Sequence, residues 1–202
     1  GDQMTWAVYN DAAPAFHNTR AGGTTPLGVE IQQTTFAFNR SGPTGQAAAA
    51  LGQTIFIRYK IINKGGNTID SMYVSQWSDP DLGGFTDDLV GCDPAPGIGF
   101  VYNSTNTDGL YGSAPPSVGY DFFQGPLLPD NTRLPMTSFN NYPNGFDPDN
   151  SSKTYNYMKG LKADGSQAIN PVTGQVTTFF VSGDPVFGTG WLDVNPGALR
   201  RA

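Results

Sequence analysis

The chain has 202 residues, of which 11 are Lys or Arg and 17 are Asp or Glu, so its net charge is −6. This balance argues against a nucleic-acid-binding protein, because phosphates require clusters of Lys and Arg, and Arg200 and Arg201 are the only adjacent basic pair. No apolar run approaches the roughly 20 residues of a membrane-spanning helix, so we expect no membrane span. The length suits one domain with a buried core, and we expect a single domain over residues 1–202.

Glycine and proline are abundant, with 26 and 16 residues, while only 14% of the chain is charged. A disordered chain is excluded, because 38% of the residues are hydrophobic and the sequence contains 3 Trp, 9 Tyr and 13 Phe. This composition is typical of extracellular β-proteins with long ordered loops held by aromatic rings, so we expect an extracellular or cell-surface location. Cys92 is the only cysteine, so it forms no internal disulfide, and we expect a buried structural thiol rather than a nucleophile.

Apolar and polar residues alternate with a period of two along much of the chain, which predicts β-strands. The clearest strand is Gln53–Asn63, and the run Lys64-Gly65-Gly66-Asn67 after it predicts a hairpin turn into a returning strand. The apolar phase changes inside the strand expected at Leu27–Asn39, which indicates a β-bulge. Further strands are expected at Asp2–Asn10, Thr68–Trp77, Ile98–Asn103, Val118–Phe123, Thr132–Tyr142 and Thr177–Val181. We therefore predict an all-β fold, a β-sandwich of the Ig-like or jelly-roll-like kind with long ordered loops.

One turn-rich segment, Trp77–Asp93, contains five acidic residues: Asp79, Asp81, Asp87, Asp88 and Asp93. Calcium takes roughly six to eight hard oxygen ligands, which carboxylates supply, and Gly83 and Gly84 let the backbone curl so that carbonyl oxygens can join them. Adjacent carboxylates also repel one another unless a cation or protons neutralise them. We therefore predict a calcium site formed by these five residues. Their spacing is not that of an EF-hand, and the alternative is that the aspartates cap turns by bonding their own backbone amides.

A second acidic pair, Asp147 and Asp149, repeats the Asp-Pro-Asp pattern of the first segment and is a candidate second metal site. The alternative, which we favour, is a turn that leads into a short helix after Asn150. Ser151 or Ser152 can cap such a helix, because a serine hydroxyl accepts a hydrogen bond from an amide of the first turn.

Catalytic motifs are absent from the sequence. His17 is the only histidine, so a two-histidine metal motif is excluded and a Ser-His-Asp triad would need this one residue. Glu30 is the only glutamate and falls within an expected strand, where a surface or paired acid is the ordinary role. No nucleophile elbow, phosphate loop or dinucleotide fingerprint occurs. We therefore expect no enzymatic activity.

Several longer motifs lie along the chain: Asp2-Gln-Met-Thr-Trp, Tyr59-Lys-Ile-Ile-Asn-Lys-Gly, Trp77-Ser-Asp-Pro-Asp-Leu-Gly, Asp87-Asp-Leu-Val-Gly-Cys-Asp, Tyr120-Asp-Phe-Phe-Gln-Gly-Pro and Gly183-Asp-Pro-Val-Phe-Gly-Thr-Gly-Trp-Leu-Asp. Together they resemble a conserved region of large secreted proteins of Bacteroidetes and Ignavibacteria, many of which carry a type IX secretion sorting signal. The resemblance implies a surface or extracellular product in which strands precede and follow this stretch. We accordingly expect a processed product or an excerpt of a larger secreted protein.

A modification site is also expected. Asp70-Ser71-Met72 resembles the Asp-Ser/Thr-apolar signal for O-linked sugars in Bacteroidetes, which makes Ser71 a candidate glycosylation site. The competing interpretation is an ordinary serine at the start of a strand.

Two non-enzymatic functions are consistent with these features, and a hydrolase that uses a pair of aspartate carboxylates is kept as a third, less favoured alternative. In the first, the chain is a structural subunit or module of an extracellular bacterial assembly, a filament or surface layer, with loops stabilised by calcium. Copies of the chain, or other surface proteins, would then be the partners, in contact through sheet edges and the rings of Tyr111 and Tyr142. In the second, it is a carbohydrate-binding or adhesion module that stacks sugars on exposed tyrosine rings, drawn from Tyr111, Tyr120, Tyr142, Tyr155 and Tyr157. The alternative role for those rings is to anchor loops.

Overall fold

The computed structural model describes residues 1–16, 23–39, 50–142 and 147–193. Most of their regular structure consists of strands in antiparallel pairs, which confirms the all-β prediction. The chain divides into two compact units, Gly1–Met72 (unit 1) and Tyr73–Ala202 (unit 2). The sandwich arrangement and the single domain stay predictions. In the described ranges, no helix has the length and apolar character needed to cross a membrane.

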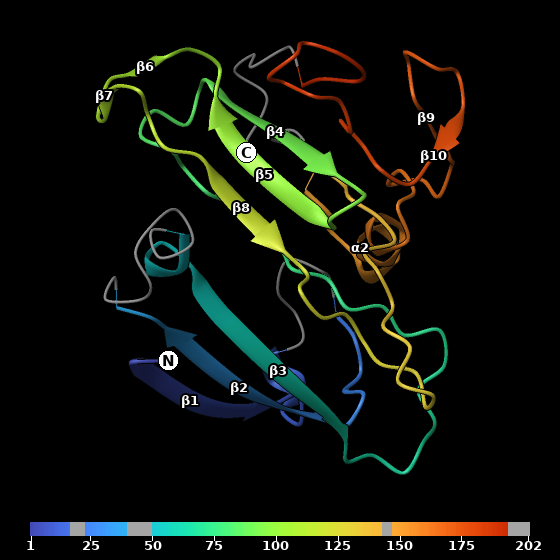
Figure 1. The fold of residues 1–202 in the computed structure, drawn as a ribbon. Helices are drawn as coiled ribbons and strands as arrows, with labels where there is room; N and C mark the ends of the chain where they lie inside the picture. The colour runs from blue at the N-terminus through green and yellow to red at the C-terminus, as the bar shows by residue number, and fades with distance from the viewer. Residues whose placement is uncertain (17–22, 40–49, 143–146, 194–202) are drawn as a thin grey trace. The chain divides into compact units, whose positions relative to one another are not determined.

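Unit 1 is built on one antiparallel sheet of order β1-β2-β3, formed by Gln3–Asn10, Val29–Ala37 and Ile55–Asn63 (Figure 1). A short 3-10 turn, η1 (Pro14–Phe16), follows β1. The register runs without interruption from Gln3 opposite Ala37 to Asn10 opposite Glu30, and β2 pairs with β3 equally regularly. The expected bulge is therefore wrong. The two apolar phases belong to the two faces of one regular strand, with Ile31 on one face and Phe36 on the other.

Packing within unit 1 is mainly aromatic and local. The rings of Phe36 and Phe56 stack with centroids 5.1 Å apart, and Phe38 meets both edge-on. The carboxylate of Asp11 accepts hydrogen bonds from the three consecutive amides of residues 27–29, which fixes the start of β2. Burial alone would raise the pKa of Asp11, but these amides hold it below its usual value.

The returning strand expected at Thr68–Trp77 is not formed. After β3, the carbonyl of Gly28 accepts hydrogen bonds from the amides of Lys64 and Gly65, which turns the chain back against the start of β2. Farther on, Ser71 has a φ of 53°, in the left-handed region that interrupts an extended strand. The chain bends at residues 65–67, but the expected hairpin is wrong, because the segment after the bend has no strand partner among the described residues.

Unit 2 contains a second antiparallel sheet of order β4-β5-β8, formed by Asp88–Asp93, Ile98–Asn103 and Val118–Asp121 (Figure 1). Two short ladders accompany it: β6 (Thr107–Asp108) with β7 (Gly112–Ser113), and β9 (Ala168–Ile169) with β10 (Val176–Thr177). A cluster of buried residues forms the core of unit 2: Leu82, Val90, Val101 and Val181, with Val118, Phe139, Phe180 and Trp191 packed against it.

Two strands that the sequence predicted in unit 2 are largely absent. The segment Thr132–Tyr142 forms isolated bridges in place of the expected strand, Leu127 with Arg133 and Phe139 with Phe179. Of the strand expected at Thr177–Val181, only Thr177 lies in β10, and Val181 at its far end has a φ of 46°, in the left-handed region.

The short helix expected after Asn150 is present as α2, Ser151–Met158. Its cap is Asn150 itself rather than either serine, because the Asn150 side chain accepts a hydrogen bond of 2.9 Å from the amide of Lys153. At the other end, Ser138 and Asn140 donate side-chain hydrogen bonds to carbonyls of the last turn, and Gly160 adopts a left-handed φ of 73°. Side chains that are distant in sequence therefore bond to the backbone carbonyls at the C-terminal end of α2.

Cys92 is also buried in unit 2, with 1% of its surface exposed, which confirms the prediction that it is buried. Its Sγ donates a hydrogen bond of 3.3 Å to the carbonyl of Phe180. Burial, with a smaller contribution from the negative charge of Asp93, raises the pKa of the thiol to about 12. The group is therefore a neutral thiol at physiological pH, which suits a structural role.

Two glycines in this sheet make room for aromatic rings, and this predicts a stability loss on substitution. A Cβ at Gly91 would lie 2.6 Å from the Phe100 ring, and one at Gly99 would lie 2.5 Å from the Phe139 ring. We expect Gly91→Ala and Gly99→Ala each to lower the free energy of unfolding by about 1 to 3 kcal/mol, because the rings must leave their positions. Urea denaturation measures this. Gly109→Ala is the control, since nothing lies within 4 Å of its Cβ position; equal losses in all three variants would contradict the packing account.

Candidate functional site

The structure gathers four carboxylates of unit 2 around the start of β4: Asp81, Asp87, Asp88 and Asp108, here called the acidic corner. Asp88, the first residue of β4, is 3% exposed. Asp93 ends the same strand, and at about 3.4 Å per residue the two Cα atoms are about 17 Å apart. The structure therefore does not bring Asp93 into the acidic corner; its Oδ1 instead accepts a hydrogen bond from the amide of Ala95. Asp79 is exposed, on the approach to the corner.

Asp88 is only half satisfied by hydrogen bonds. Its Oδ2 accepts from the amide of Leu82 at 2.8 Å, whereas its Oδ1 is buried and has no partner among the described atoms. Asn103 pairs directly with Asp88 across the β4-β5 ladder and shows the same pattern. Its Nδ2 donates to the carbonyl of Leu82 at 3.2 Å, while its Oδ1 is buried without a partner. Leaving such a polar atom unsatisfied costs about 1 to 3 kcal/mol.

The electrostatics of the corner are asymmetric. Burial raises the pKa of Asp88, and the charges of Asp87, Asp81 and Asp108 raise it further, against the opposing effect of the Leu82 amide. Asp108 has the opposite tendency, because hydrogen bonds from backbone amides, those of Tyr111 and Gly84 foremost, lower its pKa. An ionised carboxylate thus stands beside one that resists ionisation, and a cation or a proton would relieve that repulsion.

Asp108 was missed by sequence reasoning because it lies outside the acidic segment, in a Thr-Asp-Gly turn. The Asp-Gly pair was a signal for a turn, and Asp108 Oδ1 indeed accepts from the amides of Leu110 and Tyr111 at 2.8 and 2.7 Å. Its Oδ2 reaches back to the amide of Gly84 at 2.9 Å. Gly83 has a φ of 79°, and a Cβ there would lie 2.1 Å from Asp108 Oδ1. Glycine at 83 is therefore required for this close approach.

The fit of a metal ion can be tested on the donor atoms. Over the described ranges, no three His, Cys, Asp or Glu side chains form a ready ligand set. The two unpartnered atoms, Asp88 Oδ1 and Asn103 Oδ1, are nevertheless the oxygen types that calcium takes from proteins. Asp81, Asp87 and Asp108 carry further carboxylate oxygens near them. The chemistry of the donors fits calcium, and the site stays a prediction.

The second acidic pair has partners of its own. Asp149 accepts hydrogen bonds from Lys153 Nζ at 2.8 Å and from Asn150 Nδ2 at 2.7 Å. The Lys153 ammonium holds the pKa of Asp149 below its usual value. Asp147 interacts electrostatically with the Tyr157 hydroxyl. Asp149 thus bonds to residues at the start of α2, which agrees with the favoured alternative of a turn that leads into a short helix.

Most of the tyrosines considered for sugar stacking are engaged within unit 2. Tyr142 stacks on Tyr157 with centroids 5.2 Å apart and accepts a hydrogen bond from the indole of Trp77. Tyr155 meets Tyr73 edge-on and lies under the Lys159 ammonium. The hydroxyl of Tyr120 accepts a hydrogen bond of 2.5 Å from Ser78. Tyr111 is 51% exposed, whereas the other four tyrosines have contacts that anchor loops.

The remaining candidate residues are separate from the acidic corner. Ser71 is exposed at a bend, so its hydroxyl position agrees with either a modified or an ordinary serine. Glu30 forms an ion pair with Lys64 at 3.8 Å, the ordinary role expected for it. His17 lies outside the described residues.

No protein-family model, curated protein or solved structure matches this chain. The resemblance to secreted Bacteroidetes and Ignavibacteria proteins therefore stays a prediction.

The raised pKa of Asp88 predicts a specific pH dependence. The native state holds the Asp88 proton more tightly than the unfolded chain, so this residue's contribution to stability is present in acid and is lost as pH rises through its folded pKa. Each unit of pKa elevation corresponds to about 1.4 kcal/mol. In the presence of a chelator, we expect Asp88→Asn to be more stable than the parent at neutral pH, with the difference shrinking in acid. Urea unfolding between about pH 4 and pH 8 measures it. Asp93→Asn is the control, and a parent and Asp88→Asn pair with parallel pH profiles would contradict the assignment.

Proposed function

We propose that the chain is a structural module of an extracellular bacterial assembly, a filament or a surface layer, in which copies associate through the open edge of the unit 1 sheet and calcium fixes the acidic corner. One observation supports the association above all others. β1 is an edge strand of eight residues, and every one of them is exposed. Met4 is 66% and Trp6 65% exposed.

An exposed apolar edge strand is a template for pairing with another strand. The outer edge of β1 offers about eight backbone groups for a new ladder, and at about 1 kcal/mol per net hydrogen bond these would only match an association cost of about 4 to 15 kcal/mol. Burial of apolar side chains such as Met4 and Val8, worth up to about 1.5 to 3 kcal/mol each, supplies the remainder. Strand pairing with simultaneous burial is therefore the favoured contact between copies.

Calcium has a separate role in the proposal. An ion at Asp88 Oδ1 and Asn103 Oδ1 would supply the missing partner for two buried oxygens and offset the repulsion among the carboxylates of the corner. It would thereby tie the segment before β4 to the Asp108 turn. Extracellular calcium modules work with dissociation constants of about 10⁻⁴ to 10⁻³ M, so a site with few preformed ligands suits that environment.

The location and the absence of catalysis are parts of the same proposal. Low charge, abundant glycine and proline, and the resemblance to secreted surface proteins with type IX sorting signals support an extracellular module. The only glutamate is held in an ion pair with Lys64 and the only thiol is buried and neutral, which supports a structural rather than an enzymatic role.

Calcium binding predicts a shift in thermal stability. At calcium concentrations about 10 to 100 times the dissociation constant, we expect about 1.4 to 2.7 kcal/mol of stabilisation over the chelated protein, seen as a rise of a few degrees in Tm. Magnesium should have a smaller effect, because it requires a tighter octahedral shell. Asp88→Asn should lose the response and Asp93→Asn should keep it. Identical melting curves with calcium and with chelator would contradict the calcium site.

Edge pairing predicts a charge-dependent association. We expect the parent chain to associate with rising concentration. Ala7 is near the middle of β1 (Gln3–Asn10), so an antiparallel pairing centred on it places residue 7 of one copy opposite residue 7 of the other. We therefore expect Ala7→Lys and Ala7→Glu each to remain monomeric, because like charges then face each other. Mixing the two variants should restore association. Sedimentation velocity measures all three samples. A parent chain that stays monomeric at high concentration with calcium would contradict the assembly, and equal association of both single variants would exclude β1 as its edge.

A further inference from the structure

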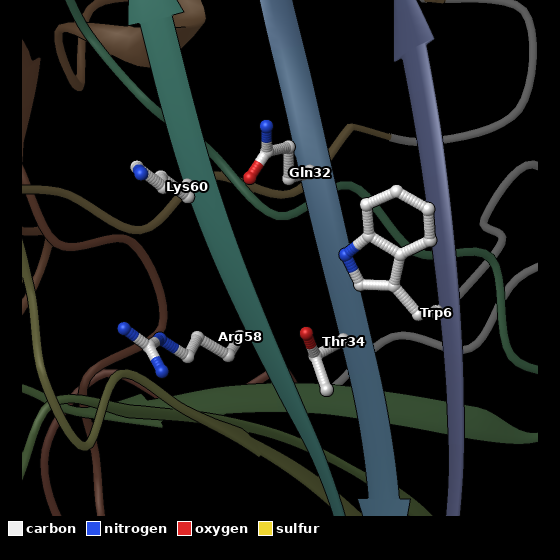
Figure 2. A pocket seen from close by; sticks show the side chains of 5 residues that line it. All are labelled: Trp6, Gln32, Thr34, Arg58 and Lys60. Atoms are coloured by element: carbon white, nitrogen blue, oxygen red, sulfur yellow. The ribbon is translucent and has the colours of Figure 1, made fainter.

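A shallow groove crosses one face of the unit 1 sheet, lined by Trp6, Gln32, Thr34, Arg58 and Lys60 (Figure 2). The strand register brings these residues together. Trp6 pairs with Thr34, which pairs with Arg58, and in the adjacent row on the same face Gln32 pairs with Lys60. The groove encloses about 150 Å³, below the roughly 300 to 1,000 Å³ of an enclosed small-molecule pocket. A polymer that lies across the sheet fits this shape better than a small ligand.

The two cationic side chains of the groove are available to a ligand. Within the described part of the chain, no carboxylate forms an ion pair with Arg58 or Lys60, whereas Lys64 on the same sheet pairs with Glu30. Arg58 and Lys60 are two residues apart on β3, so their Cα atoms are about 7 Å apart along the strand. In an acidic protein, two neighbouring unpaired cations on one face indicate an anionic ligand.

The indole of Trp6 forms the other side of the groove. Trp6 is 65% exposed, and Figure 2 shows its ring between β1 and β2 with the ring nitrogen turned toward β2. The strand bearing Trp6 and the strand bearing Arg58 are separated by one intervening strand, about 10 Å in total. An exposed flat ring beside cations can pack against the apolar face of a sugar whose charged group reaches the cations.

Polar groups lie between the ring and the cations. Gln32 Nε2 donates a hydrogen bond of 2.9 Å to Glu30, which orients the amide and leaves Gln32 Oε1 as an acceptor. The Thr34 hydroxyl lies in the neighbouring row and can both donate and accept. Hydroxyl-rich ligands need such groups, and an apolar partner does not.

We propose that this groove binds an acidic polysaccharide composed of uronic-acid residues. The indole stacks on one sugar ring, Arg58 and Lys60 bind carboxylates of that sugar and its neighbour, and Gln32 and Thr34 bond to hydroxyls. Arg offers a planar pair of donors that matches a carboxylate. The extent of the groove, about 10 Å by 7 Å between Cα positions, suits about two sugar residues.

The charge of the chain favours a uronate polymer over more highly charged ones. Nucleic acids and heavily sulfated polymers owe their affinity to many neutralised charges, and this groove has two cations on a chain of net charge −6. A uronate has one charge for each sugar, which two cations can match. The inference does not rest on the proposed assembly, because four of the five groove residues belong to β2 and β3, away from the outer edge of β1. Met4 and Val8, which the assembly would bury, lie on the same face as Trp6 but do not line the groove. The inference also uses none of the tyrosines expected from the sequence.

The test is calorimetric titration of the full chain with short oligogalacturonates, without added calcium. We expect saturable binding that weakens with salt, and at least about tenfold weaker binding of the methyl-esterified oligomers, which keep the sugar backbone but have no charge. Trp6→Ala and the double variant Arg58→Gln/Lys60→Gln should each lose about tenfold or more in affinity. Tyr59→Ala, a ring on the opposite face of the same sheet, and Lys162→Gln, a cation of unit 2, should bind like the parent.

A second measurement keeps the test independent of variant stability. In NMR spectra of the parent chain, the indole signal of Trp6 should shift on titration while those of Trp77 and Trp191 remain in place. Ala7→Lys should retain the binding even if it abolishes association, so failure of the assembly and failure of the groove are distinguishable. Equal binding of esterified and free oligomers, tighter binding of single-stranded DNA, or unchanged affinity in the Arg58→Gln/Lys60→Gln variant would each overturn the proposal.

Discussion

The burial of the Asp88 carboxyl group is the constraint on which the core of unit 2 depends. Asp88 begins β4, the strand that carries Val90 and Cys92 into the core, so the strand cannot form without withdrawing this group from water. Hydrogen bonding satisfies only one of its oxygens, and three other carboxylates oppose its ionisation. The turns around Asp88 surround its unpartnered oxygen, and the Asp108 carboxylate holds the backbone amide of Gly84 near this group through a hydrogen bond.

Unit 1 differs from unit 2 in that it lacks a buried core among its described residues. Its three strands pair regularly over their whole length, yet none of its described residues is buried. Backbone hydrogen bonds and the Phe36–Phe56 stack stabilise the sheet, while Met4 and Trp6 remain in contact with solvent. Apolar surface of this kind is usually a site of interaction. The edge of β1 and the groove beside Trp6 are two separate uses of it, one by a second strand and one by a glycan.

Loop order in unit 2 comes from specific pairs rather than from regular structure. Tyr142 links the segment before α2 to Tyr157 and to Trp77, and Asn140 bonds to carbonyls at the end of the helix. Each contact joins residues far apart in sequence. Tyrosine rings that are engaged in contacts between loops are poorly placed to bind sugars. The groove of unit 1 is therefore the better candidate for a glycan site.

The sequence by itself determined the features that depend on local pattern. Period-two alternation located β1, β3 and β5, the capping residues near Asn150 located α2, and the position of the single cysteine between Gly91 and Asp93 led to the prediction of a buried structural thiol. Only the tertiary structure decided the rest. Asp88 proved to belong to a strand because Asn103 pairs with it across the ladder, and Asp108 joins the corner through a bond to Gly84 that no spacing indicates. The groove requires the register of three strands that are not contiguous in sequence. Long-range pairing creates such sites, and local periodicity contains no information about which strands will be neighbours.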